Sequence, residues 1–120
     1  EEYAWLSQNG ENIENYKKDK YCTFKFTVSA MQDLITLNML SNIKAWYKKI
    51  SKKLPIFIIS GEMDPVGNYS KGVKEVYKKL IRAGANARLK LYPKMRHEIL
   101  MDDCRAEVIT DVTRFISENL

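Results

Sequence analysis

The sequence has few of the residues from which metal sites and disulfide frameworks are built. It contains two cysteines, Cys22 and Cys104, and a single histidine. The cysteines are far apart and belong to no Cys-x-x-Cys pair, which argues against a dedicated zinc site. This usage fits a reducing, cytoplasmic setting, although it leaves open one disulfide between the two cysteines.

The sequence also lacks long apolar runs and a recognisable signal peptide. No stretch approaches the ~20 apolar residues that a membrane helix needs, so we expect no stable membrane insertion. Only five glycines and three prolines occur in 120 residues, which argues against disorder, and the 45% hydrophobic content permits the core of one domain. There is no initiator methionine before Glu1. We therefore expect the chain to begin within a longer polypeptide.

The formal net charge of +5 raises the alternative of a nucleic-acid-binding module. The lysines, however, occur in small groups on expected helix faces, and no aromatic side chains alternate with them. Such a pattern favours a solvated surface over a nucleic-acid partner. The alternative would require an affinity that falls steeply with added salt.

Residues 1–50 are predicted to form helices and no strand. Thr27 is suited to cap a helix. The apolar residues that follow it recur at helical spacing: Val28, Met31, Leu34, Ile35 and Met39. Pro55 prevents the helical part from continuing.

From residue 51 onward the pattern is that of a βαβα unit. Residues 56–59 predict a strand covered on both faces, and residues 88–92 predict a strand nearer a sheet edge. Between them, Ser70 stands where the N-cap of a helix belongs, and that helix ends before Gly84. Asp102 or Asp103 is expected to start a last helix with several inward-facing apolar residues, namely Val108, Ile109, Val112, Phe115 and Ile116. The fold class is therefore α/β with a parallel sheet, divided into a helical segment, 1–50, and a βαβα segment, 51–120.

Two candidate catalytic residues follow the two predicted strands. Asp64 comes after the first strand, and His97, the only histidine, comes after the second. Functional loops of parallel sheets lie beyond the carboxyl ends of the strands, so these two side chains can meet. A carboxylate and an imidazole presented in this order are two-thirds of a Ser-His-Asp triad. No Gly-x-Ser-x-Gly elbow occurs in the sequence to supply the third.

Simpler interpretations of these residues stay open at this point. Asp64 precedes Pro65, and Asp-Pro is ordinary turn chemistry; Glu62 competes with Asp64 for the catalytic role. His97 could be an exposed loop histidine. Other polar residues are better explained structurally: Ser60 and Ser70 lie outside any nucleophile elbow, Asp102 and Asp103 suit a helix cap, and Cys104 is expected to be packed rather than reactive.

Longer stretches resemble a known family. Residues 55–67 closely resemble the acid loop of α/β-hydrolases, in the branch of monoacylglycerol lipases, lysophospholipases and serine aminopeptidases. Residues 92–100 resemble the histidine loop of that branch, although Lys94 and Met95 stand where small residues often precede the histidine. Residues 5–7 and 24–28 are similar to its helical cap.

The resemblance covers only the carboxyl-terminal half of the family's fold. It implies a partial α/β-hydrolase fold with Asp64 as the triad acid and His97 as the triad base, and it implies no metal or organic cofactor. The nucleophile and the oxyanion hole lie upstream in the family, so the chain alone is expected to be inactive. The implied enzyme hydrolyses carboxylic esters such as a lysophospholipid or a monoacylglycerol, with residues 1–50 forming part of a lid.

Two further expectations concern assembly and the rival function. With two strands and helices on one side, the sheet would keep an unpaired edge, so we expect pairing with the missing amino-terminal half or self-association. The rival is a non-catalytic interaction domain built on half of a hydrolase fold.

Overall fold

The strands and helices of the computed structural model follow the order that the sequence predicts. The structure describes residues 2–43 and 45–120. Three helices come first, α1 (Gly10–Lys18), α2 (Val28–Ser41) and α3 (Ala45–Lys49); they are followed by β1 (Pro55–Gly61), α4 (Lys71–Arg82), β2 (Asn86–Tyr92) and α5 (Arg105–Ser117). The two strands are parallel and in register from Pro55 opposite Asn86 to Gly61 opposite Tyr92. The α/β fold class is confirmed.

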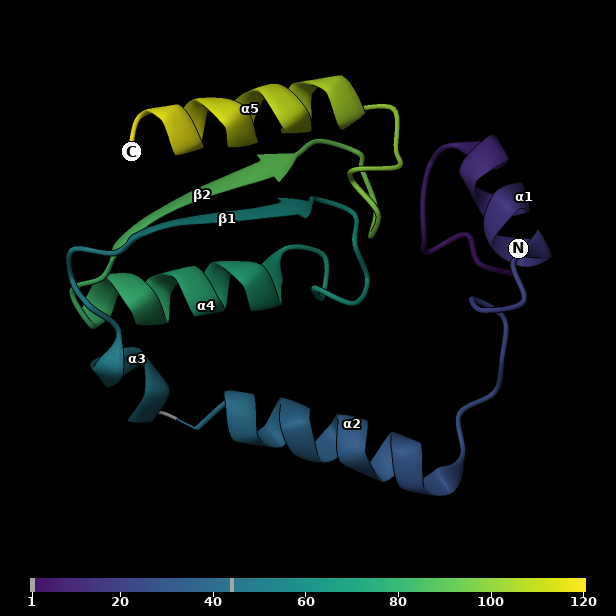
Figure 1. The fold of residues 1–120 in the computed structure, drawn as a ribbon, viewed down its shortest axis with the longest axis horizontal. Helices are drawn as coiled ribbons and strands as arrows, with labels where there is room; N and C mark the ends of the chain where they lie inside the picture. Colours follow the sequence, from purple (N-terminus) through teal and green to yellow (C-terminus); the bar gives the residue numbers. More distant parts are fainter. Residues whose placement is uncertain (1, 44) are drawn as a thin grey trace.

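The sheet is covered by a helix on each face, with α4 on one side and α5 on the other (Figure 1). Successive side chains of a strand point to opposite faces. Accordingly Ile56 and Ile58 pack toward α4, in a cluster that contains Leu80. Ile59 packs in the second cluster, with Val108 of α5. The expectation of helices on one side is therefore wrong, because β1 is apolar at consecutive positions and needs cover on both faces.

The ends of the helices agree only in part with the sequence. Thr27 caps α2 as predicted, since its hydroxyl accepts a hydrogen bond from the amide of Ala30. Gly84 follows α4 with a φ of 80°, a conformation that favours glycine. Ser70 occupies the N-cap position of α4, but its hydroxyl donates to the Glu62 carbonyl oxygen at 2.9 Å.

The last helix starts later than predicted, at Arg105 rather than at Asp102 or Asp103. The carboxylate of Asp102 instead accepts hydrogen bonds from the backbone amides of Gln8 and Asp103. Of the residues expected to face inward, Ile109 and Ile116 are 47% and 50% exposed. The two-stranded sheet is too narrow to cover all the apolar side chains of α5.

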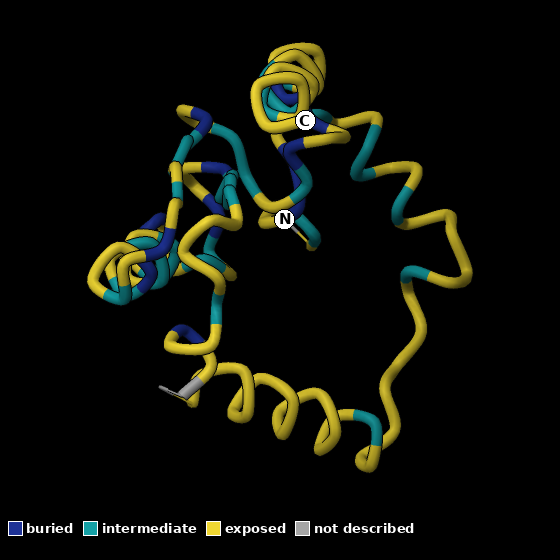
Figure 2. The backbone as a smooth tube through the Cα atoms, turned by 60° about the vertical axis from the view of Figure 1, so that its left-hand side comes forward, coloured by how far each residue is buried: buried dark blue, intermediate teal, exposed yellow. Residues whose placement is uncertain are grey.

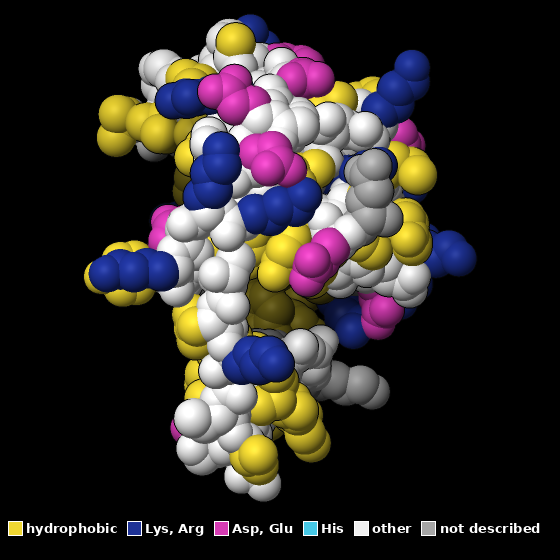
Figure 3. Space-filling model, turned by 90° about the vertical axis from the view of Figure 1, so that its right-hand side faces the viewer, with side chains coloured by type: hydrophobic (Ala, Val, Ile, Leu, Met, Phe, Trp, Pro, Cys, Tyr) yellow, Lys and Arg dark blue, Asp and Glu magenta, His cyan; other side chains and the backbone are white. Residues whose placement is uncertain are grey.

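Helix α2 lies apart from the sheet and its two covering helices (Figures 1 and 2). All its residues except Ala30 are exposed, including its apolar side chains, listed here: Val28, Met31, Leu34, Ile35, Leu37, Met39 and Leu40. In Figure 3, hydrophobic side chains protrude from the lower part of the molecule, where α2 lies. The radius of gyration is 16.3 Å, against roughly 14 Å for a compact domain of this length. The helix therefore presents apolar surface without a covering layer in this chain.

Candidate active site

The loops that follow β1 and β2 lie against each other at the carboxyl end of the sheet. The amide of Glu62 donates to the carbonyl oxygen of Tyr92 at 2.9 Å, and the amide of Met63 donates to that of Met95 at 2.8 Å. These two bonds extend the parallel pairing beyond the last strand residues. These backbone bonds hold the acid loop, which follows β1, beside the histidine loop, which follows β2, independently of the side chains.

Asp64 and His97 are in direct contact. The Nδ1 atom of His97 lies 3.0 Å from Oδ2 of Asp64. Asp64 is 6% exposed, whereas the side chain of His97 is 40% exposed. An ionised carboxylate can only accept, so this contact places the proton on Nδ1 and leaves Nε2 as the basic nitrogen. A buried carboxylate therefore orients a half-exposed imidazole through one of its two ring nitrogens.

The turn after Asp64 supports the same contact. The second carboxylate oxygen, Oδ1, accepts from the amide of Val66 at 2.9 Å, and the Asp64 carbonyl oxygen accepts from the amide of Tyr69. Asp64 therefore forms the Asp-Pro turn and contacts His97 at once. The turn and the contact with His97 are therefore compatible, because each uses a different oxygen of the Asp64 carboxylate. Glu62, the competing carboxylate, is exposed.

The same loop contains strained backbone. Asn68, Tyr69 and Ser70 have φ values of 52°, 50° and 70°. Non-glycine residues rarely adopt this left-handed region, and three in a row are held only where the surroundings dictate them. The burial of Ser70, at 1% exposure, and its bond to Glu62 supply part of that constraint. Strain is thus concentrated between the acid and α4.

Residues from the beginning of the chain complete the surroundings of His97. The ring of Trp5 lies 5.2 Å from the imidazole, centroid to centroid. Arg96 donates from Nη1 to the carbonyl oxygens of Ala4 and Ser7, the latter at 3.1 Å. The sequence pointed to residues 5–7 only through resemblance, and no periodicity or spacing could have joined them to His97.

An open cavity of about 320 Å³ lies beside Trp5 and Arg96. Its lining combines aromatic, apolar and polar side chains, from Ala4, Trp5, Gln8, Met63, Pro65, Tyr69 and Arg96. It is bounded by both the acid loop and the first residues of the chain.

The remaining nucleophilic candidates are occupied by structural contacts. The hydroxyl of Ser60 donates to the carbonyl oxygen of Gly61, and the thiol of Cys104 donates to that of Ile99 at 3.4 Å. Burial raises the pKa of the Cys104 thiol, which disfavours the reactive thiolate. Cys22 and Cys104 are both free, so the disulfide that the sequence left open is not formed.

A charged network ties β2 to α5 behind the site. Lys90 forms ion pairs with Glu107 and Asp111, and the hydroxyl of Tyr92 donates to Asp111 at 2.9 Å. The hydrogen bonds from Lys90 and Tyr92 hold the pKa of Asp111 below its ordinary value. Burial, followed by the bond to Asp111, raises the pKa of Tyr92. This network anchors the strand that leads into the histidine loop.

The described part of the chain contains neither a metal-binding cluster nor a helix that could span a membrane. Within residues 2–43 and 45–120, no cluster of three or more His, Cys, Asp or Glu side chains has a geometry suited to a metal ion. No helix in that part of the chain combines the length and apolar character needed to cross a membrane.

Comparisons with known proteins agree with this architecture. No curated protein matches the chain. A carboxyl esterase from Bacillus coagulans, solved in complex with glycerol, superposes with a TM-score of 0.83 and 30% identity over 95% of this chain. A structure described as "Lipase (Open form)" superposes with a TM-score of 0.87 and 29% identity over 96% of this chain. The chain spans 38% of the length of each of these structures.

The family comparison covers most of the chain. The sequence pattern of the family described as "Serine aminopeptidase, S33" matches residues 1–104. That range includes α1 through β2, Asp64 and His97. The chain belongs to the serine aminopeptidase S33 family of α/β-hydrolases.

Proposed function

We propose that this chain supplies the acid and the base of a Ser-His-Asp triad, while another part of the hydrolase fold supplies the nucleophilic serine. The observation that carries the proposal is the 3.0 Å contact between Nδ1 of His97 and Oδ2 of Asp64. It leaves Nε2 of the imidazole free of the acid and able to take a proton. The reaction is the hydrolysis of a carboxylic ester.

In this mechanism His97 transfers one proton in each half of the reaction. Its Nε2 takes the proton of the serine hydroxyl as that oxygen attacks the ester carbonyl, and then delivers it to the departing alcohol. Water next attacks the acyl-enzyme carbonyl while Nε2 takes its proton, and His97 delivers that proton to the serine oxygen as the acyl–serine bond breaks and the carboxylic acid is released. Asp64 holds the tautomer of His97 and stabilises the imidazolium in both steps.

For the substrate we propose a lipid-like ester, such as a lysophospholipid or a monoacylglycerol. The support is the apolar, exposed surface of α2, which suits a lid over an acyl chain, and the lipase among the similar structures. In this proposal residues 1–50 are the cap and connector, and residues 51–120 are the carboxyl-terminal part of the catalytic core.

We also propose that the chain pairs with the missing amino-terminal half, or with itself, along β1. In the described part of the chain β1 is bonded on one side, by β2. A mainly apolar hollow of about 430 Å³ lies between β1 and α4 and includes Ile58, Val66, Val73 and Val76 in its lining. A further strand against β1 would close it.

The deciding experiment compares His97→Ala with an exposed control, Asp103→Asn. Both are placed in a polypeptide that joins this chain to an amino-terminal hydrolase segment with a nucleophilic serine. We expect His97→Ala to lower kcat for a short-chain ester by roughly 10⁴-fold or more, and Asp103→Asn to leave it unchanged. Unchanged hydrolysis by His97→Ala would favour the non-catalytic interaction domain.

The chain by itself offers a second test. We expect no covalent labelling by a fluorophosphonate, a probe of activated serines, because Ser60 and Ser70 are tied into loop contacts. A labelled serine in the isolated chain would contradict the assignment of the nucleophile to another segment.

A further inference from the structure

The first residues of the chain run alongside the histidine loop, residue against residue. Arg96 bonds to the carbonyl oxygen of Ala4, the ring of His97 lies against Trp5, and the amide of Glu98 donates to the carbonyl oxygen of Leu6 at 2.9 Å. The pairs 96 with 4, 97 with 5 and 98 with 6 are consecutive. We call residues 4–8 the clamp segment.

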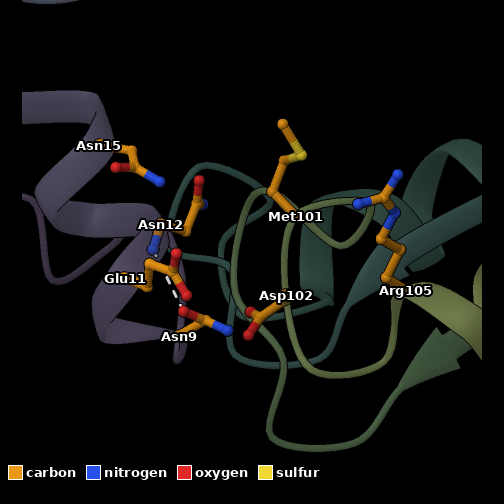
Figure 4. Close-up of a pocket in the computed structure, with 7 residues that line it drawn as sticks. All are labelled: Asn9, Glu11, Asn12, Asn15, Met101, Asp102 and Arg105. Carbon is orange, nitrogen blue, oxygen red and sulfur yellow. Dashed lines mark hydrogen bonds between the residues drawn. The ribbon is translucent and has the colours of Figure 1, made fainter. Parts of the chain in front are cut away.

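The clamp segment is firmly held. Leu6 and Ser7 are 1% and 0% exposed, among the most buried residues of the chain. At its end, the amide of Gln8 donates to both oxygens of Asp102, at 3.2 and 3.1 Å, and its side chain donates to the carbonyl oxygen of Lys94 at 2.9 Å. Figure 4 shows Asp102 facing Asn9, the N-cap residue of α1, in the lining of a polar cavity. The segment is therefore bonded to the histidine loop on both sides of His97.

This support matters because the Asp64 contact alone constrains the imidazole weakly. The His97 side chain is 40% exposed, and water competes for a single hydrogen bond to such a group, so the bond constrains it only weakly. An imidazole can also leave its rotamer by rotation about χ1 or χ2. A second ring in contact with the imidazole, even tilted by 52° as here, restricts that rotation. Trp5 occupies this position, and its neighbours Ala4 and Leu6 are bonded to the neighbours of His97.

Resting on the proposed function, we propose that Arg96 is a positioning residue: through the clamp segment it holds Trp5 against His97 and so keeps Nδ1 facing Asp64. Its guanidinium joins two carbonyl oxygens, those of Ala4 and Ser7, on either side of Trp5 and Leu6. A planar group with several donors can bridge two acceptors at once. The indole thereby becomes part of the catalytic centre without reacting.

His97 is the sole histidine, so the test can be read from one imidazole. In the full chain labelled with ¹⁵N-histidine, the Nδ1–H proton bonded to Asp64 should give a single downfield NMR signal. Arg96→Met keeps the aliphatic stem but removes the donors. Trp5→Leu removes the ring and keeps the backbone bonds. The control is Arg88→Met, which breaks an exposed ion pair with Glu118 on the far part of the fold.

We expect Arg96→Met and Trp5→Leu to lose the signal while circular dichroism reports retained helix and strand, and Arg88→Met to keep it. Retention of the signal by both test variants would overturn the inference. Loss in Arg96→Met with retention in Trp5→Leu would overturn the route through the indole. If Arg96→Met does not fold, Trp5→Leu alone decides. Absence of the signal in the unmodified chain would refute the Asp64–His97 pair, and with it the proposed function as well.

A kinetic measurement separates positioning from binding. In a polypeptide that also carries the nucleophile, Arg96→Met should lower kcat by about 10- to 100-fold with KM changed less than twofold, because a misplaced base slows proton transfer. An unchanged kcat would also overturn the inference, whereas a triad that is inactive before substitution would count against the proposed function.

Discussion

Gly61 lies directly against the backbone of Arg96. A Cβ atom at position 61 would come within 2.0 Å of the Arg96 carbonyl oxygen and 2.4 Å of that of Met95. Real Cβ atoms do not approach backbone this closely, so the two loops that carry Asp64 and His97 can meet only because residue 61 has no side chain.

We therefore predict that Gly61→Ala separates the two loops. The expected loss is more than about 2 kcal/mol of unfolding free energy, together with loss of the His97 NMR signal. Gly10→Ala is the matched control, since nothing lies within 4 Å of a Cβ there, and alanine should favour α1 slightly. Chemical denaturation of both variants measures the difference. Equal stabilities would show that the loops are not in contact.

The triad role of Asp64 is testable by Asp64→Asn. The amide has nearly the same shape, but it can no longer stabilise an imidazolium and can hold the wrong tautomer. We predict that kcat falls by about 10⁴-fold with the fold preserved. The measurement is ester hydrolysis by a polypeptide that includes the nucleophile, with Glu62→Gln as the matched control on the same loop. A strong effect of Glu62→Gln and none of Asp64→Asn would exchange their roles.

The network behind the site predicts a dependence of stability on acid. Lys90 and Tyr92 lower the pKa of Asp111, so ionised Asp111 stabilises the folded chain above its ordinary pKa, about 4. The contribution is lost as the pH falls through the lowered value. Thermal unfolding should find Asp111→Asn less stable than the unmodified chain at pH 6, with a difference that shrinks below pH 4. A difference independent of pH would contradict this linkage.

The exposed surface of α2 predicts association. Leu37 and Met39 are 65% and 69% exposed, and their contact with water is unfavourable unless another surface covers them. We predict that the isolated chain self-associates in sedimentation velocity, and that Leu37→Gln with Met39→Gln weakens this association without lowering the unfolding temperature. Lys48→Gln with Lys49→Gln on α3 is the polar control. A chain that is monomeric before substitution would contradict association through α2, and it would also argue against the self-pairing proposed along β1.

The sequence predicted the parts of the structure that depend on local pattern. The apolar run 56–59 and the stripe after Ser70 specify a strand and a helix by periodicity. Parallel strands then bring Asp64 and His97 to one edge of the sheet. Thr27 and Gly84 fulfil their predicted roles, since a cap and a helix end are determined by neighbours within a few residues.

What the sequence missed depends on contacts between distant segments. Asp102 was expected to cap α5, but its carboxylate bonds to the amide of Gln8, which lies far away in the chain. Ser70 was expected to cap α4, but the positive φ of three successive residues directs its hydroxyl to Glu62. Local propensity cannot reveal such partners. Nor could it reveal that α2, with an apolar stripe typical of a packed helix, lacks a covering surface here.

The contact between Asp64 and His97 is complete within this piece of the family's fold. Under the proposed triad roles, two polypeptides divided at this junction would each be inactive toward esters, since one would hold a nucleophile without a base and the other a base without a nucleophile. A chromogenic ester would then be hydrolysed only when the two polypeptides associate. If the proposed roles hold, the division would offer a conditional reporter of proximity, to which this piece of the fold contributes an acid and an imidazole that are already in contact.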